Sequence, residues 1–211
     1  MEKTSGIPPT DFRILSTQEI DNLDPVLVLN INVGVMGHID SGKTSVCRVI
    51  SKIASTASLD KNPQSQARGI TIDIGFSSFT VELNTSLAEH LNLQKRYVQF
   101  TLVDCPGHAT FMKSVIAGSN IIDLMMLVVD VKKGIQIQTA ECLALGEIMR
   151  LPLLVILNKC DQLTSEERFG PSSLFEKSAK MIYTLIQKTN YPNKSQLKVI
   201  PFSCNFPEAE M

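Results

Sequence analysis

The sequence predicts an α/β fold of three layers, in which a mostly parallel central sheet lies between helices. Apolar runs of strand length alternate with segments of helical periodicity along most of the chain. Two of these runs, residues 122–129 and 152–158, are almost continuously apolar, which is typical of parallel strands covered on both faces. With 211 residues, 44% of them apolar, the chain has enough material for one well-buried domain.

The individual elements follow from the spacing of apolar residues. Val46, Val49, Ile50 and Ile53 recur at helical spacing directly after a glycine-rich loop. A later helix is predicted to have Cys142, Leu145, Ile148 and Met149 on one side. The segment that joins the predicted strands at 71–83 and 97–103 is polar. In chain order, the sequence predicts strands at residues 27–35, 71–83, 97–103, 122–129, 152–158 and 198–202 and helices at 42–54, 139–149 and 175–186.

The two ends of the chain differ from this alternating pattern. Residues 1–27 are polar and contain three prolines, so we expect a loosely held extension, although Ser16 and Glu19 stand at capping-box spacing and predict a short helical turn. A translational-type GTP-binding domain is then expected at residues 28–205, on the motifs described below. The tail at 206–211 is too short for the helix that would normally complete such a fold, so we expect a fragment that lacks its final helix.

Composition excludes several classes of protein. The formal net charge is −1, which argues against a protein that binds nucleic acid mainly by electrostatic attraction. The chain shows neither a signal peptide nor an apolar run long enough for a bilayer, so no membrane partner is expected. Its five cysteines lack C-x-x-C spacing, which disfavours a disulfide framework or zinc site. We expect a cytoplasmic monomer.

The glycine-rich loop has the spacing of a phosphate-binding loop. Its glycines permit tight turns that direct backbone N–H groups at phosphate oxygens, and it opens onto a helix N-terminus, which favours anions. The Lys43 ammonium would neutralise the β- and γ-phosphates, and the Thr44 hydroxyl is a hard oxygen ligand for Mg²⁺. His38 is predicted only to shape the turn. The nucleotide-binding candidates in this segment are Gly37, Asp40, Ser41, Gly42, Lys43, Thr44 and Ser45.

Two further segments, one at Thr71 and one at residues 104–108, would complete the phosphate end of the site. Asp104 ends an apolar strand, where its carboxylate can hold Mg²⁺ through a water. Thr71 is the candidate second hydroxyl ligand, with a surface threonine as the alternative. Gly107 allows a backbone N–H to approach the γ-phosphate, and His108 lies where it can orient the attacking water or merely pack in a loop.

The end of the next buried strand predicts selection of guanine. The Asp161 carboxylate can accept hydrogen bonds from the ring N–H and the exocyclic amine of guanine, a pair that adenine does not present. Asn158 can tie this loop to the phosphate loop, and the aliphatic stem of Lys159 can cover the base. Ser203 and Cys204 follow the last strand and can offer backbone N–H groups to the guanine carbonyl, unless they form a plain turn.

Two of these motifs, GHIDSGKT at residues 37–44 and DCPGH at 104–108, resemble those of translational GTPases. Residues 60–77, 121–130 and 138–143 resemble the selenocysteine-specific elongation factor of eukaryotes and archaea. The resemblance implies a P-loop GTPase fold, Mg²⁺ with GTP or GDP, and a His108 that positions water for ribosome-stimulated hydrolysis. It also implies delivery of selenocysteinyl-tRNA to the ribosome, mainly through domains beyond this chain. Another tRNA-carrying translational GTPase and a truncated nucleotide-binding module without hydrolysis are the alternatives.

Overall fold

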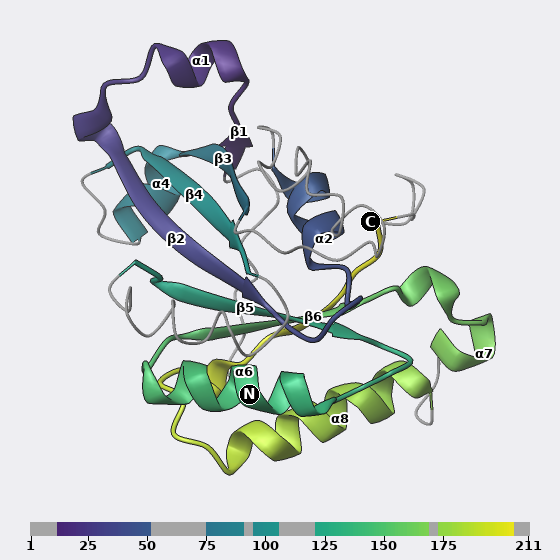
Figure 1. Ribbon diagram of the computed structural model, residues 1–211. Coiled ribbons are helices and arrows are strands. Elements are labelled where there is room, and N and C mark those ends of the chain that lie inside the picture. The colour runs from purple at the N-terminus through teal and green to yellow at the C-terminus, as the bar shows by residue number, and fades with distance from the viewer. Residues whose placement is uncertain (1–11, 52–74, 91–94, 106–120, 169–172, 205–211) are drawn as a thin grey trace.

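The computed structural model describes residues 12–51, 75–90, 95–105, 121–168 and 173–204, and these residues form one seven-stranded sheet in the order β1-β3-β4-β2-β5-β6-β7 (Figure 1). The strands are β1 (Phe12–Ile14), β2 (Val28–Met36), β3 (Gly75–Leu83), β4 (Tyr97–Asp104), β5 (Leu124–Asp130), β6 (Leu153–Asn158) and β7 (Val199–Pro201). The helices are α1 (Thr17–Asp21), α2 (Lys43–Ile50), α4 (Thr85–His90), α6 (Ile137–Ile148), α7 (Ser165–Arg168) and α8 (Leu174–Gln187), with short 3-10 turns at η1 (Pro25–Leu27), η3 (Cys160–Gln162) and η4 (Lys194–Gln196).

The sheet is mostly parallel, as predicted. Strands β4, β2, β5, β6 and β7 pair in parallel, whereas β3 pairs antiparallel with β4 and β1 antiparallel with β3. The parallel strands β5 and β6 have near-continuous apolar sequences because both of their faces are covered. The predicted fold class is confirmed.

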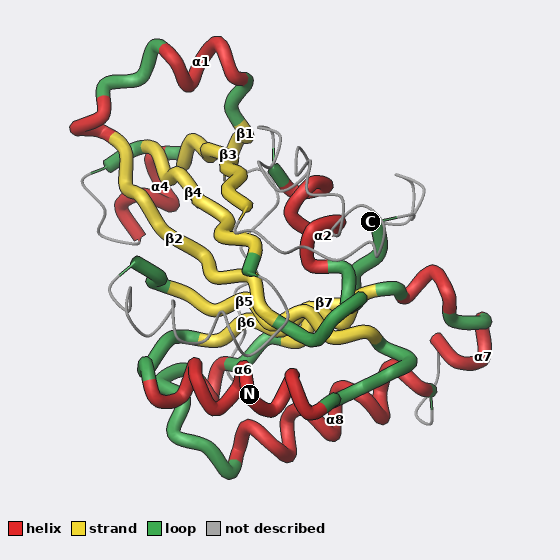
Figure 2. Tube along the Cα trace, in the orientation of Figure 1, coloured by secondary structure: helices red, strands yellow, loops and turns green. Residues whose placement is uncertain are grey.

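Helices cover both faces of this sheet (Figure 2). Helices α6 and α8 pack on one face, where Leu143, Ile182 and Ile186 join β5 and β6 side chains in the largest buried cluster. Helix α2 packs on the opposite face and buries Val46 and Cys47 against β2. Within the described residues, no helix is long and apolar enough to cross a membrane.

One local prediction is wrong, and one short helix was not predicted. Helix α6 buries Leu143 and Leu145, but the Ile148 side chain, predicted on the same face, is 78% exposed. The reason is a close approach at Gly146, where an added Cβ would collide with Met125 and Tyr191, so this position sets the side that faces the sheet. The polar segment between β3 and β4 also contains the short helix α4, whose Ala88 packs on a small cluster at the sheet edge.

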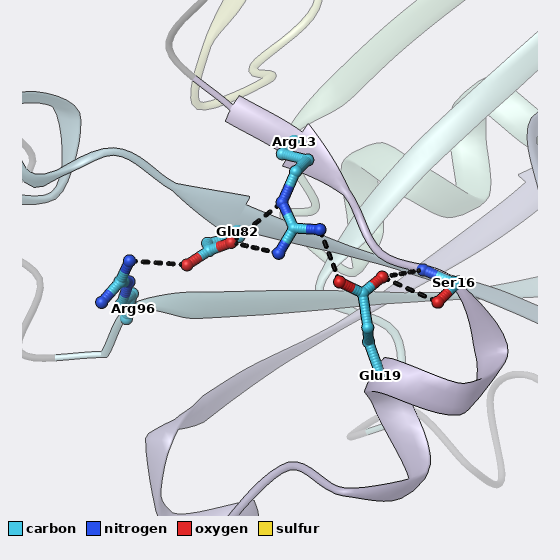
Figure 3. Close-up of polar contacts among 5 residues, drawn as sticks. All are labelled: Arg13, Ser16, Glu19, Glu82 and Arg96. Carbon is cyan, nitrogen blue, oxygen red and sulfur yellow. Dashed lines mark hydrogen bonds and ion pairs between the residues drawn. The ribbon is translucent and has the colours of Figure 1, made fainter.

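Residues 12–27 are attached to the sheet rather than loosely held. Arg13 on β1 pairs with Glu82 on β3, and its guanidinium also contacts Glu19 on α1 at 2.5 Å (Figure 3). The predicted capping box is present, with Ser16 N donating to Glu19 Oε2 at 2.8 Å. Leu15 is 1% exposed. A strand of three residues has no detectable periodicity, so only its pairing with β3 defines it.

Candidate functional site

The described candidate residues gather at the carboxyl ends of the parallel strands. The glycine-rich loop follows β2, Asp104 ends β4 and Asn158 ends β6. The strand register places Val35 beside Asp104 and Asp130 beside Asn158. Ligand sites in open α/β sheets lie beyond this edge because the loops that follow parallel strands converge there. The topology therefore brings together segments that are more than a hundred residues apart.

The two glycines of the loop are required by its backbone. Gly37 has φ +149° and Gly42 has φ +91°, both unfavourable for residues with a Cβ. A Cβ on Gly42 would also collide with Asn158 Nδ2, and one on Gly37 with the Val128 carbonyl. The first intrahelical bond of α2 runs from Val46 N to Gly42 O at 2.9 Å. The amides of residues 43–45, including Ser45, precede this first bond and belong to the helix N-terminus, which suits an anion.

Lys43 folds back over the loop. Its ammonium group donates to the carbonyls of Gly37 at 3.2 Å and His38 at 2.8 Å, and the residue is 7% exposed. Burial lowers the pKa of Lys43, because the charged form loses water. The loop therefore holds a positive charge that an anionic ligand would stabilise.

Thr44 and Asp104 lie in direct contact. Thr44 Oγ1 donates to Asp104 Oδ2 at 2.6 Å, and Asp104 is fully buried. Within the described part of the chain, Asp104 Oδ1 has no hydrogen-bond partner, and burial raises the pKa of this carboxyl. A hydroxyl beside a buried carboxylate with an oxygen to spare is a donor set that suits a hard cation such as Mg²⁺.

The loop after β6 is tied to the phosphate loop by two side chains. Asn158 Nδ2 donates to Ser41 O at 2.9 Å, which is the contact the sequence predicts, and both residues are buried. Lys159 Nζ donates to the carbonyl of Asp40 at 2.5 Å. Asp40 contributes this carbonyl at φ +62°, while its side chain is exposed. The two loops thus form one connected wall.

The far side of this wall comes from the segment after β7. Ser203 Oγ donates a short hydrogen bond to Asp161 Oδ1, and Cys160 N donates to Phe202 O at 3.2 Å. Cys204 follows as a half-buried free thiol. The structure therefore brings Ser203 and Asp161 together, as a site for one base would need. Thr71, Gly107 and His108 lie outside the described residues.

Two contacts to the site were missed by sequence reasoning. Gln138 Oε1 on α6 accepts from Ile39 N at 2.9 Å, and Asp130 Oδ2 pairs with Lys159 Nζ at 2.9 Å. Asp130 carries a detectable signal, because it ends an apolar strand as Asp104 does. Gln138 carries none, since its partner lies 99 residues away.

Comparison with known proteins identifies the family of this chain. The family described as the elongation factor Tu GTP-binding domain matches residues 29–208. The selenocysteine-specific elongation factor of Mus musculus is 48% identical over 163 residues, which are 77% of this chain and 27% of that protein. The factor of the same name from Methanocaldococcus jannaschii is 46% identical over 138 residues, 65% of this chain and 26% of its own length.

Solved structures give the same result. Translation elongation factor SelB from Methanococcus maripaludis, bound to the GTP analogue GppNHp, superposes with a TM-score of 0.57 at 29% identity, covering 83% of this chain and 30% of that one. A bacterial selenocysteine-specific elongation factor superposes with a TM-score of 0.59 at 25% identity, covering 82% and 25%. The chain spans about a quarter of the length of the curated relatives it matches. It belongs to the elongation factor Tu GTP-binding domain family, and its likeness to selenocysteine-specific elongation factors is confirmed.

Proposed function

We propose that this chain is the GTP-binding and GTP-hydrolysing domain of an elongation factor that delivers selenocysteinyl-tRNA to the ribosome. The observation that carries the proposal is the meeting of three parts at one sheet edge: the phosphate loop, the buried Thr44–Asp104 contact and the Asn158–Ser41 tie. The relatives support the choice of tRNA, because both curated relatives are named selenocysteine-specific.

The phosphates of the nucleotide would bind to the phosphate loop. Gly37, Ser41, Gly42 and the amides of residues 43–45 would surround them, with the Lys43 ammonium turning from the loop carbonyls to the β- and γ-phosphates. Gly107 would add a backbone N–H at the γ-phosphate. This exchange of partners needs no new burial of charge, because Lys43 is already desolvated.

Thr44 and Asp104 would hold Mg²⁺, with Thr71 as the further ligand when GTP is bound. The ion, when present, neutralises charge on the phosphate oxygens during hydrolysis. The support for this assignment is the direct Thr44–Asp104 contact and the spare buried oxygen of Asp104.

His108 would position the attacking water, with the ribosome as the activator. The isolated domain should hydrolyse GTP slowly, at about 10⁻⁴ to 10⁻² s⁻¹, as GTPases do without an activator. Delivery of tRNA would require the rest of a longer protein, since the chain spans about a quarter of its curated relatives. Ribosome-stimulated phosphate release also separates this proposal from a nucleotide-binding module without hydrolysis.

The base would bind between Lys159, Asp161 and the backbone of Ser203 and Cys204. Titration with fluorescent GDP and GTP, with ATP as competitor, tests the proposal directly, and guanine-specific binding is expected. The Asp161→Asn variant should lose affinity for guanine nucleotides and gain affinity for xanthine nucleotides, because its hydrogen-bonding pattern is swapped. The substitution keeps an oxygen that can accept from Ser203. Unchanged GTP affinity in this variant would remove Asp161 from the base pocket.

A further inference from the structure

Asp130 is a buried carboxylate at the site that binds neither phosphate, metal nor base in the proposed function. It ends β5 and pairs in the parallel register with Asn158, the residue that directly precedes Lys159 in the sequence. The residue is 3% exposed, and the hydrogen bonds of its carboxylate go to the turn after β5 and to the loop after β6. Burying a charge in this way is costly unless its partners are well placed.

The two oxygens of Asp130 have different partners. Oδ1 accepts from the backbone amides of Lys132 at 2.9 Å and Lys133 at 3.2 Å, which shapes the turn after β5. Oδ2 pairs with the Lys159 ammonium at 2.9 Å. Burial alone would raise the pKa of Asp130, but the Lys159 side chain and these two amides together keep it below its usual value, so the carboxyl is ionised at neutral pH.

The Lys159 side chain is consequently fixed at its backbone and at its ammonium group. Its backbone lies in the left-handed region at φ +65°, and its ammonium bridges Asp130 on one side and the carbonyl of Asp40 on the other. An aliphatic chain of four methylenes has many rotamers of similar energy, and fixing both of its ends selects one path. That path runs from the base loop to the phosphate loop.

We propose that Asp130 is a positioning residue for guanine-nucleotide binding, which holds the Lys159 side chain across the site so that its stem forms one wall of the base pocket. The inference rests on the proposed function, because it assumes that a guanine base occupies this pocket. Asp130 does not touch the nucleotide and acts only through Lys159.

The Asp130→Asn variant separates the two roles of this side chain. The asparagine oxygen can keep accepting from the amides of Lys132 and Lys133, which preserves the turn. Its NH₂ group then faces the Lys159 ammonium, donor against donor, so only the contact with Lys159 is lost. The Asp130→Ser variant, which also keeps an oxygen for the turn and removes the carboxylate, serves as a second version of the same test.

The test is a double-mutant cycle on the full 211-residue chain. The dissociation rate of N-methylanthraniloyl-GDP is measured by displacement with excess GDP for wild type, Asp130→Asn, Lys159→Met and the double variant. Asp130→Asn should release GDP roughly ten-fold faster, as expected when a charge-assisted hydrogen bond is lost. In the Lys159→Met background the same change should have less than a two-fold effect, because methionine cannot pair with the carboxylate.

Glu147→Gln is the matched control. Glu147 lies at the opposite end of α6 and accepts from Asn190 N at 2.8 Å, so it is also a carboxylate with structural hydrogen bonds but far from the site. Its release rate should equal that of wild type. An equal acceleration by Asp130→Asn in both Lys159 backgrounds, or none in either, would overturn the inference while the proposed function stands. Failure of the wild-type chain to bind the probe would refute both.

Discussion

Truncation of Asn158 to alanine should weaken both the fold and nucleotide binding, because this side chain joins the two loops of the site. Asn158 is 2% exposed, and its Nδ2 donates to the buried carbonyl of Ser41 at 2.9 Å. The Asn158→Ala variant removes the donor and leaves the carbonyl without this partner. The phosphate loop then loses the contact that fixes it to the end of β6.

The expected magnitude follows from the burial of both groups. A buried carbonyl that loses its partner costs about 1–3 kcal/mol, and we take about 2 kcal/mol. For a chain of this size, this corresponds to a fall in Tm of about 4–8 °C. If nucleotide binding must restore the same order in the loop, GDP affinity falls roughly 30-fold, since about 1.4 kcal/mol is ten-fold in affinity.

Asn193 offers a matched control near the other end of the same strand. Its side chain accepts from Leu153 N and donates to Leu153 O, both at 2.9 Å. The Asn193→Ala variant should therefore also lower Tm but leave GDP affinity unchanged. The two measurements are thermal unfolding without nucleotide and equilibrium titration with fluorescent GDP. If Asn158→Ala binds GDP as tightly as Asn193→Ala does, the tie to Ser41 does not organise the site.

Three further predictions concern the loop and the hydrolysis step. Gly42→Ala should abolish measurable GDP binding, because its φ of +91° is strained and its Cβ collides with Asn158; Gly134→Ala, at φ +62° with open space around the new Cβ, should cost only about 1 kcal/mol and keep the affinity. Burial first, and then the charges of nearby lysines, lower the pKa of His38 in the folded state. Below pH of about 6.5 the unfolded chain therefore binds the extra proton and stability falls; His38→Gln should flatten Tm between pH 7.5 and 5.5, and an unchanged slope would contradict this assignment. His108→Ala should keep GTP affinity and lose ribosome-stimulated phosphate release, whereas a parallel loss of both would make His108 a structural residue.

Local sequence patterns were sufficient for most of the fold. The strands at β2, β4, β5 and β6 were predicted within one or two residues, because strand-length runs rich in apolar and β-branched residues can be recognised without tertiary information. The phosphate loop could also be predicted, since its glycines answer to a local backbone requirement. The same holds for the Ser16–Glu19 capping box, whose two members are three residues apart.

What only the tertiary structure decided are the contacts between residues distant in sequence. The side of α6 that faces the sheet depends on the space beside Gly146, and the attachment of Arg13 depends on Glu82 of another strand. At the site, Gln138 and Asp130 act on residues 39 and 159, which no spacing rule connects to them. The sequence by itself determined which residues are suited to a guanine-nucleotide site. The order of the strands determined which of them meet, because hydrogen bonds and ion pairs act over a few ångströms of space and carry no signal along the chain.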